Sequence, residues 1–152
     1  MRHLTDDLGF DAAFDYHGGN LPKKLADAAP NGIDVYFDNV GGDHLEAALS
    51  LMRPRGRVAL CGAIAQYNDT TPPPGPNNLV LAIGLGLTLR GFIVSQYNNR
   101  RADFRRDMES WIATRRVRYD ETKLRGIDNA AKAFIGLFTG ENVGKMVVEL
   151  SE

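Results

Sequence analysis

Hydrophobic residues in this chain alternate between short continuous runs and stretches with a spacing of three or four. The run at 33–38, IDVYFD, is nearly continuous and predicts a parallel strand covered on both faces. A helix is expected at 44–52, where the apolar residues recur on one side: Leu45, Ala48, Leu49 and Met52. The two glycines Gly41 and Gly42 lie between these elements. The order strand, glycine turn, helix is typical of an α/β protein.

The same alternation continues along most of the chain. Leu4 and Leu8 indicate a short helical tail, and a Pro/Asn/Gly-rich segment at 68–78 predicts a loop because each proline removes a backbone donor. Asp128 is the expected N-cap and Gly140 the expected C-terminal stop of a late helix. Further helices are expected at 21–29, 79–87 and from 103 onwards, and further strands at 11–16, 57–64, 89–94 and 145–150. This order predicts an α/β fold with a doubly wound parallel sheet.

The glycine turn after 33–38 is the first candidate for a binding site. In open α/β sheets, ligands bind beyond the carboxyl ends of the strands, which places Asp38, Asn39, Gly41 and Gly42 where a cofactor would lie. Glycine also lets a ligand approach the backbone without a Cβ in the way. A tight turn that binds nothing is the alternative, and this segment alone does not separate the two.

Composition and charge narrow the class of protein. The 152 residues are 43% hydrophobic and 24% charged, which is typical of a globular domain. Eighteen basic and nineteen acidic residues give a net charge of -1, so we expect no nucleic-acid partner and no membrane partner. Cys61 has no second cysteine with which to form a disulfide, and the N-terminus lacks the apolar core of a signal peptide. We therefore expect a cytoplasmic protein.

Other kinds of functional site find little support in the sequence. His3, His17 and His44 lie in different elements, and with a single cysteine no metal site is expected. No serine lies in a Gly-x-Ser-x-Gly elbow. Cys61 has apolar neighbours in a predicted strand, which favours structural burial over a reactive thiolate.

Arginines crowd around the helix that begins near residue 103. A nucleic-acid face is conceivable there, but Asp103, Asp107 and Glu109 are interleaved with them, which is more typical of a solvated helix with ion pairs. The arginines are Arg100, Arg101, Arg105, Arg106, Arg115, Arg116 and Arg118.

Several short motifs become specific when they are taken in order. They are LGFDAAFDY, GIDVYFDNVGG, GRVALCGAIAQYN, the proline loop, LRGFIV and GENVGKMVVEL. Over nearly the whole chain this series resembles the C-terminal half of the zinc-independent medium-chain dehydrogenase/reductases. Within them it is most similar to the NADPH-dependent alkenal/one double-bond reductases, which include the prostaglandin reductases and the bacterial curcumin reductases.

The resemblance implies a fold and an activity. Residues 1–118 would be a partial Rossmann-type nucleotide-binding domain that lacks its first strands, and 119–152 a helix and strand that return to the absent catalytic domain. Reduction of the C=C bond of a small α,β-unsaturated aldehyde or ketone by hydride transfer from NADPH is implied, and a homo-oligomer is expected. Because the glycine-rich phosphate-binding turn is missing, we expect the isolated chain to be inactive. The alternative is a non-catalytic module that self-associates or binds a partner.

The resemblance also assigns roles to single residues. Tyr16 is similar to the tyrosine that contacts the adenosine 2′-phosphate, while His17 replaces a lysine frequent in the family, which leaves NADPH over NADH open. Tyr67 is similar to the tyrosine that reaches toward cofactor and substrate, and is the expected catalytic residue. The remaining cofactor-binding candidates are Asn39, Gly41, Gly42, Cys61, Gly62, Ala63, Ile64, Phe92, Ile93, Val94 and Asn142. For the apolar members, ordinary packing at strand ends is the alternative.

Overall fold

The computed structural model describes residues 1–71 and 73–150, which form two compact units. One unit is Met1–Arg101 and the other is Ala102–Glu152. The predicted boundary between 118 and 119 separates a nucleotide-binding part from a segment that belongs to the catalytic domain of a longer enzyme. It stays a prediction.

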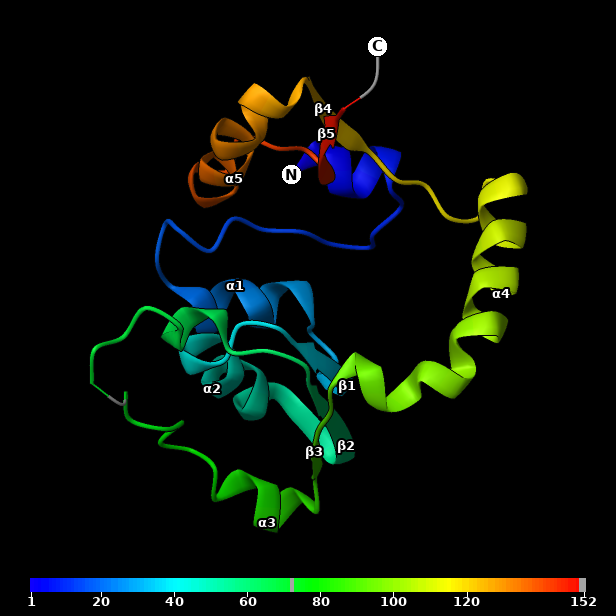
Figure 1. The fold of residues 1–152 in the computed structure, drawn as a ribbon. Coiled ribbons are helices and arrows are strands. Elements are labelled where there is room, and N and C mark those ends of the chain that lie inside the picture. The colour runs from blue at the N-terminus through cyan, green and yellow to red at the C-terminus, as the bar shows by residue number, and fades with distance from the viewer. Residues whose placement is uncertain (72, 151–152) are drawn as a thin grey trace. The chain divides into compact units, whose positions relative to one another are not determined.

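The first unit contains a sheet of three parallel strands (Figure 1). They are β1 (Ile33–Asp38), β2 (Met52–Leu60) and β3 (Thr88–Gly91), in the order β1-β2-β3. Tyr36 lies opposite Val58, and Val58 lies opposite Leu89. The predicted parallel α/β arrangement is therefore confirmed, and the carboxyl ends of β1 and β2 meet at one edge of the sheet.

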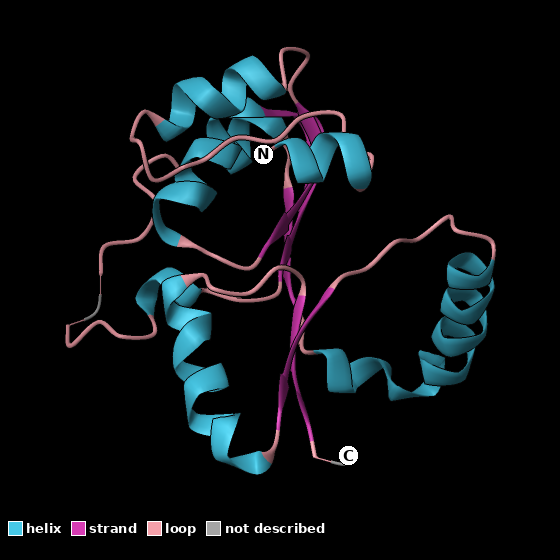
Figure 2. Cartoon of the chain, turned by 90° about the horizontal axis from the view of Figure 1, so that it is seen from above, coloured by secondary structure: helices cyan, strands magenta, loops and turns pink. Residues whose placement is uncertain are grey.

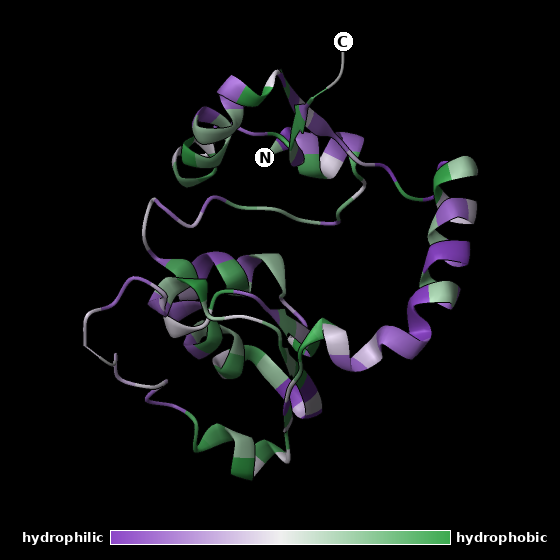
Figure 3. Ribbon diagram, in the orientation of Figure 1, coloured by the Kyte–Doolittle hydropathy of each residue, from purple (hydrophilic) through white to green (hydrophobic). Residues whose placement is uncertain are grey.

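Three helices accompany this sheet: α1 (Leu21–Ala28), α2 (Gly42–Leu51) and α3 (Leu81–Leu85). The buried centre of the unit consists of Leu49 from α2 with Met52 and Val58 from β2. Fully burying a side chain of this size stabilises the fold by about 1.5–3 kcal/mol. The partly buried residues around this centre are Ile33, Tyr36, Leu45, Leu60, Leu85, Leu87 and Leu89. α3 is largely hydrophobic in the colouring of Figure 3, and its Ile83 is exposed.

The second face of β1 is open, contrary to expectation. Val35 is 55% exposed and Phe37 is 56% exposed, although a strand buried on both faces was predicted. Side chains alternate between the faces of a strand, so the apolar run supplies residues to both faces, and within this unit the core of Leu49, Met52 and Val58 covers one of them. The sheet thus presents an apolar surface.

Several predicted strands differ in the structure. Residues 11–16 are not a strand, and a strand needs a neighbour for its backbone hydrogen bonds, which no described segment provides here. β2 ends at Leu60, so Cys61 lies in the following loop and is exposed rather than buried. β3 ends at Gly91, and Phe92 and Ile93 lead into a 3₁₀ segment, Val94–Arg100. The other short helical segments are a π-helical turn, His3–Asp7, and 3₁₀ turns at Ile64–Gln66 and Ile127–Asn129.

The second unit contains α4 (Arg101–Ala113, whose first residue closes the first unit), β4 (Glu121–Arg125), α5 (Ala130–Thr139) and β5 (Lys145–Glu149). β4 and β5 are parallel and lie side by side, with Lys123 opposite Val147 (Figure 2). β4 was not predicted, because its sequence ETKLR is mostly polar.

The ends of α5 and the surface of α4 test two further expectations. Asn129, not Asp128, is the N-cap residue of α5, because a 3₁₀ turn precedes the helix, whereas Gly140 does end it at φ 68°. On α4, Arg106 pairs with Asp103 at 3.1 Å, as the ion-pair interpretation of its arginines requires. No helix in the part of the chain that the structure describes is long and apolar enough to cross a bilayer.

Candidate functional site

Asp38, the last residue of β1, organises the turn that follows the strand. Its side chain is 1% exposed, and its Oδ1 atom accepts hydrogen bonds from the backbone N–H groups of Val40 and Gly41, each at 3.0 Å. The hydroxyl of Tyr36 donates a third hydrogen bond to the same oxygen at 3.1 Å. Burial, followed by the charge of Asp38, raises the pKa of Tyr36 far above its usual value, so this phenol stays a donor.

The loop after β2 packs directly against this turn. The backbone N–H groups of Cys61 and Gly62 donate to the carbonyl oxygen of Asp38, at 2.8 and 3.1 Å. Ile64 N–H donates in the same way to Asn39 O at 3.2 Å. The two loops therefore form one structure at the carboxyl ends of β1 and β2.

Glycines are required where these loops meet. Gly41 has φ +71°, and a Cβ added there would lie 3.3 Å from the Cβ of Ala63. A Cβ added at Gly62 would lie 3.1 Å from Asn39 O and 3.3 Å from the Tyr67 hydroxyl oxygen. The absence of side chains at these positions thus lets the loops approach and leaves backbone groups accessible.

Tyr67 lines one side of the site. Its hydroxyl oxygen accepts a hydrogen bond from the backbone N–H of Ala63 at 3.3 Å. A hydroxyl that accepts in this way still has its own proton to donate. Tyr67 can therefore donate a hydrogen bond to a ligand oxygen.

A cavity of about 400 Å³ lies between the two loops. It brings together many of the predicted site residues: Gly41, Gly42, Cys61, Gly62, Ala63 and Tyr67. Asp38, which the sequence had placed beside a cofactor, also lines it. Leu45, Leu60, Gln66 and Pro76 line it as well and were not predicted. The Oδ2 atom of Asp38 is buried and has no hydrogen-bond partner among the described residues. An aspartate at the end of the predicted strand, three residues before Gly41, was the sequence signal for this residue.

Tyr16 lines a different cavity, also of about 400 Å³, together with Asn20 and His44. Its ring stacks on that of His17 with centroids 4.1 Å apart. It makes an edge-to-face contact with the His44 ring, with centroids 4.8 Å apart. The structure therefore places Tyr16 beside α1 and α2, in a cavity separate from the one at the glycine turn.

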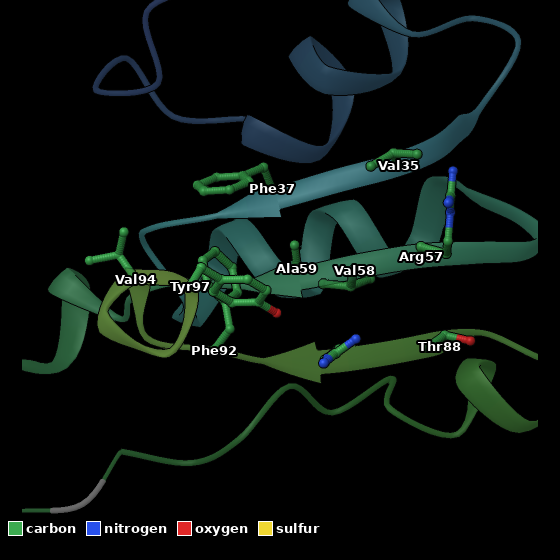
Figure 4. A pocket seen from close by; sticks show the side chains of 10 residues that line it. Val35, Phe37, Arg57, Val58, Ala59, Thr88, Phe92, Val94 and Tyr97 are labelled. Atoms are coloured by element: carbon green, nitrogen blue, oxygen red, sulfur yellow. The ribbon is translucent and has the colours of Figure 1, made fainter. Parts of the chain in front are cut away.

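A third cavity, of about 630 Å³, lies on the open face of the sheet (Figure 4). Phe92 and Val94 line it with Phe37 and Tyr97, and the Phe92 ring contacts those of Phe37 and Tyr97 at 5.8 and 5.9 Å. Phe92 and Val94, two of the three consecutive cofactor-binding candidates at 92–94, therefore share one surface.

The remaining predicted residues line none of these cavities. Ile93 and Ile64 are largely exposed, and Asn39 is exposed beside the turn. Asn142 lies in the second unit, where its side-chain amide donates to Gly144 O at 2.7 Å.

Comparison with known proteins identifies the family. Residues 2–114 match the family described as zinc-binding dehydrogenase. The chain belongs to this family. The family description names zinc, but the described residues of this chain contain no group of three His, Cys, Asp or Glu side chains that could hold a metal ion. These residues therefore do not fit a zinc ion.

Curated relatives support the narrower resemblance. The chain is 40% identical over 155 residues to the NADPH-dependent curcumin reductase of Escherichia coli, covering 99% of this chain and 45% of that protein. It is 42% identical over 143 residues to prostaglandin reductase 1 of Sus scrofa, covering 93% of this chain and 44% of that protein. The chain therefore spans less than half the length of these relatives.

A solved structure agrees with both. The crystal structure of CurA from Vibrio vulnificus in complex with NADPH matches with a TM-score of 0.89 and 38% identity, covering 99% of this chain and 46% of that one. The likeness to the curcumin and prostaglandin reductases inferred from the motifs is thus confirmed.

Proposed function

We propose that this chain forms part of the nucleotide-binding region of an NADPH-dependent reductase. Its reaction is reduction of the C=C bond of an α,β-unsaturated aldehyde or ketone. The observation that carries the proposal is the cavity at the carboxyl ends of β1 and β2, where Gly41, Gly62 and Tyr67 lie around the buried Asp38. Ligands of open α/β sheets bind at this position, and the relatives are named for NADPH and for reduction.

The residues present fit a dinucleotide. Gly41 and Gly62 leave a surface without Cβ atoms, and Asp38, whose buried Oδ2 has no hydrogen-bond partner among the described residues, lines the cavity. Together with Gly42, Cys61 and Ala63, these residues would hold the ribose side of the cofactor. Tyr16 and Asn39 would contact the adenosine part, Phe92, Ile93 and Val94 the nicotinamide, and Ile64 and Asn142 complete the proposed set.

The proposed mechanism needs no strong acid from this chain. When bound, a reduced nicotinamide would supply the hydride that adds to the β-carbon, and the oxidised nicotinamide would remain. The substrate would then be an enolate, which takes up a proton from water at its α-carbon. Tyr67 stabilises the negative oxygen by donating its hydroxyl proton in a hydrogen bond, while the Ala63 N–H holds the phenol oxygen in place.

Nucleotide binding by the purified chain tests the proposal. We expect NADPH to perturb NMR signals of the loops after β1 and β2. Gly62→Val, which places a side chain against Asn39 and Tyr67, should abolish this perturbation. Gly75→Val is the matched control, because a Cβ at Gly75 meets nothing within 4 Å. Equal binding by both variants would contradict the proposed site.

Turnover is a separate measurement. We expect the 152-residue chain alone to show no reduction of a small alkenal by NADPH, because it lacks the Gly-x-Gly-x-x-Gly turn that holds a pyrophosphate. Steady-state turnover by mass-verified chain would refute this expectation.

A self-associating module is the second candidate, and the exposed edge of β1 favours it. Among the described strands β1 pairs only with β2, and Val35 and Phe37 are exposed beside the free edge. Edges of this kind bind other strands, and a second copy of the chain would make the proposed homo-oligomer. A concentration-independent monomer in light scattering would rule this candidate out.

A further inference from the structure

The corner around Tyr16 carries an unusual set of ionisable groups. The Tyr16 ring contacts two histidine rings, that of His17 with centroids 4.1 Å apart and that of His44 with centroids 4.8 Å apart. His17 is anchored from one side, because its backbone N–H and its Nδ1 both contact Asp15 Oδ1, at 3.0 and 2.8 Å. The chain therefore holds two titratable rings against the residue proposed to contact the cofactor's 2′-phosphate.

The other charges at this corner are mainly negative. Lys24 of α1 donates to Asp15 O at 2.7 Å, which places one ammonium group beside the rings. Asp15 itself and the α2 residues Asp43 and Glu46 are carboxylates, and the latter two line the same cavity as Tyr16. The neighbouring Lys23 is paired with Asp27 at 2.6 Å.

The balance of charge therefore depends on the histidines. With both rings neutral, the corner holds one ammonium group and three carboxylates, of which the Glu46 carboxylate accepts a hydrogen bond from the Asn77 N–H at 3.1 Å. This balance of charge disfavours an anion. With both rings protonated, three cations face three carboxylates, and the repulsion is removed. Histidine is the side chain that changes charge between pH 5 and 8.

We propose that protonation of His17 and His44 sets the preference of this corner for a 2′-phosphate over a 2′-hydroxyl. The inference rests on the proposed function, since it assumes that the adenosine end of the cofactor lies at Tyr16. A phosphate monoester carries a charge of about −1.5 to −2 at pH 7 and has its second pKa near 6. Protonation of the two rings adds positive charge to the corner, and discrimination between the two nucleotides rises with it.

Adenosine 2′,5′-bisphosphate and adenosine 5′-monophosphate are suitable probes, because they differ only in the 2′-phosphate. NMR titration of the purified chain gives both dissociation constants near pH 8 and near pH 6. We expect the ratio of the two constants to favour the bisphosphate about five- to tenfold more at the lower pH, the effect of one or two partly screened charges.

Three variants isolate the histidines. The double variant His17→Gln, His44→Gln should lose the pH dependence, and His17→Lys should keep a high ratio at both pH values because its charge is permanent there. His3→Gln is the matched control, since the His3 ring contacts Asp7, at 2.9 Å, in a different element, and it should behave like the parent chain.

The outcomes separate this inference from the cofactor proposal. A ratio that does not change with pH, while both nucleotides bind, overturns the role of the histidines and leaves the NADPH proposal standing. A pH dependence that persists in the double variant comes from the phosphate itself and also overturns it. If neither nucleotide binds at either pH, both proposals fail.

Discussion

Two parts of the proposed cofactor site differ in how firmly the chain holds them. The turn after β1 centres on Asp38, which is 1% exposed. Its carboxylate accepts three hydrogen bonds, two from backbone N–H groups and one from a hydroxyl. Tyr16 is 50% exposed and lies in a segment without regular structure. The turn therefore has a fixed geometry before a ligand binds, whereas the Tyr16 corner depends on surface contacts.

The two parts differ because their hydrogen-bond partners come from different places in the chain. The turn is held by the loop that follows the neighbouring strand, through Cys61, Gly62 and Ile64. The segment before Tyr16 has no adjacent strand among the described residues, and is fixed mainly by Lys24 and His17 contacting Asp15. Parts of a binding site are thus preorganised only where neighbouring elements of the sheet are present.

Removing the carboxylate on each side should give the largest contrast. Asp38→Ala leaves the backbone N–H groups of Val40 and Gly41 without an acceptor, and should lower the free energy of unfolding by about 3 kcal/mol. Asp15→Ala removes only exposed contacts and should leave the free energy of unfolding unchanged within error. Urea unfolding followed by circular dichroism measures both, and similar midpoints for the two variants would contradict the contrast.

Glycine substitutions make a second, smaller comparison. Gly41 and Gly19 have nearly the same φ, +71° and +72°, but only Gly41 has neighbours within 4 Å of an added Cβ. Gly41→Ala should cost about 2–3 kcal/mol, and Gly19→Ala about 1 kcal/mol from backbone strain alone. Thermal unfolding gives both values. Equal losses would show that the contact with Ala63 relaxes freely.

The ligand contacts should differ between the two parts in specificity. Tyr16→Phe should weaken binding of adenosine 2′,5′-bisphosphate by about 1 kcal/mol, roughly fivefold, and leave adenosine 5′-monophosphate nearly unchanged. Asn39→Ala, beside the turn, should weaken both NADPH and NADH. Calorimetric or NMR titration distinguishes these patterns, and equal effects of Tyr16→Phe on both nucleotides would mean that Tyr16 only packs.

The smallest expected effect is on the titration of Asp15. Hydrogen bonds from the backbone N–H of His17 and then from its ring lower the pKa of this carboxyl below its ordinary value. A lowered pKa in the folded state stabilises it above the ordinary pKa of the carboxyl, and this contribution is lost as the pH falls through the folded value. His17→Gln should reverse only part of the lowering of the Asp15 pKa, because the backbone donor remains. NMR titration of the Asp15 carboxyl carbon measures this pKa. A return to the ordinary value in the variant would assign the whole effect to the His17 ring.

The strands that could be predicted from the sequence are those with apolar runs and partners within the chain. β1 and β2 pair with each other, so their pattern located both strands, although β2 spans Met52–Leu60 rather than the predicted 57–64. The glycine turn between β1 and α2 was located from residue type alone. Residues 11–16 have a comparable pattern but no described neighbour, and β4 pairs with β5 although its residues are mostly charged. Strand formation depends on a partner distant in sequence, which a local pattern does not contain.

The site was predictable to a similar extent. Glycine and tyrosine positions after β1 and β2 could be assigned to one cavity because parallel strands end at the same edge. The internal role of Asp38 was not evident, because it depends on a side chain folding back onto Val40 and Gly41. The exposure of Cys61 followed from the length of β2, which hydrophobicity does not determine.

The free edge of β1 has a consequence for isotope exchange. In a parallel strand, a residue directs its N–H and C=O to one neighbour and the next residue directs them to the opposite side. Along Ile33–Asp38, every second amide is therefore bonded to β2, while those between face an edge that no other described strand occupies. Deuterium should enter this strand in an alternating pattern of slow and fast amides. Any polypeptide that pairs with this edge would slow exchange of the fast amides alone. The exchange rates of the individual β1 amides therefore show whether the edge is paired.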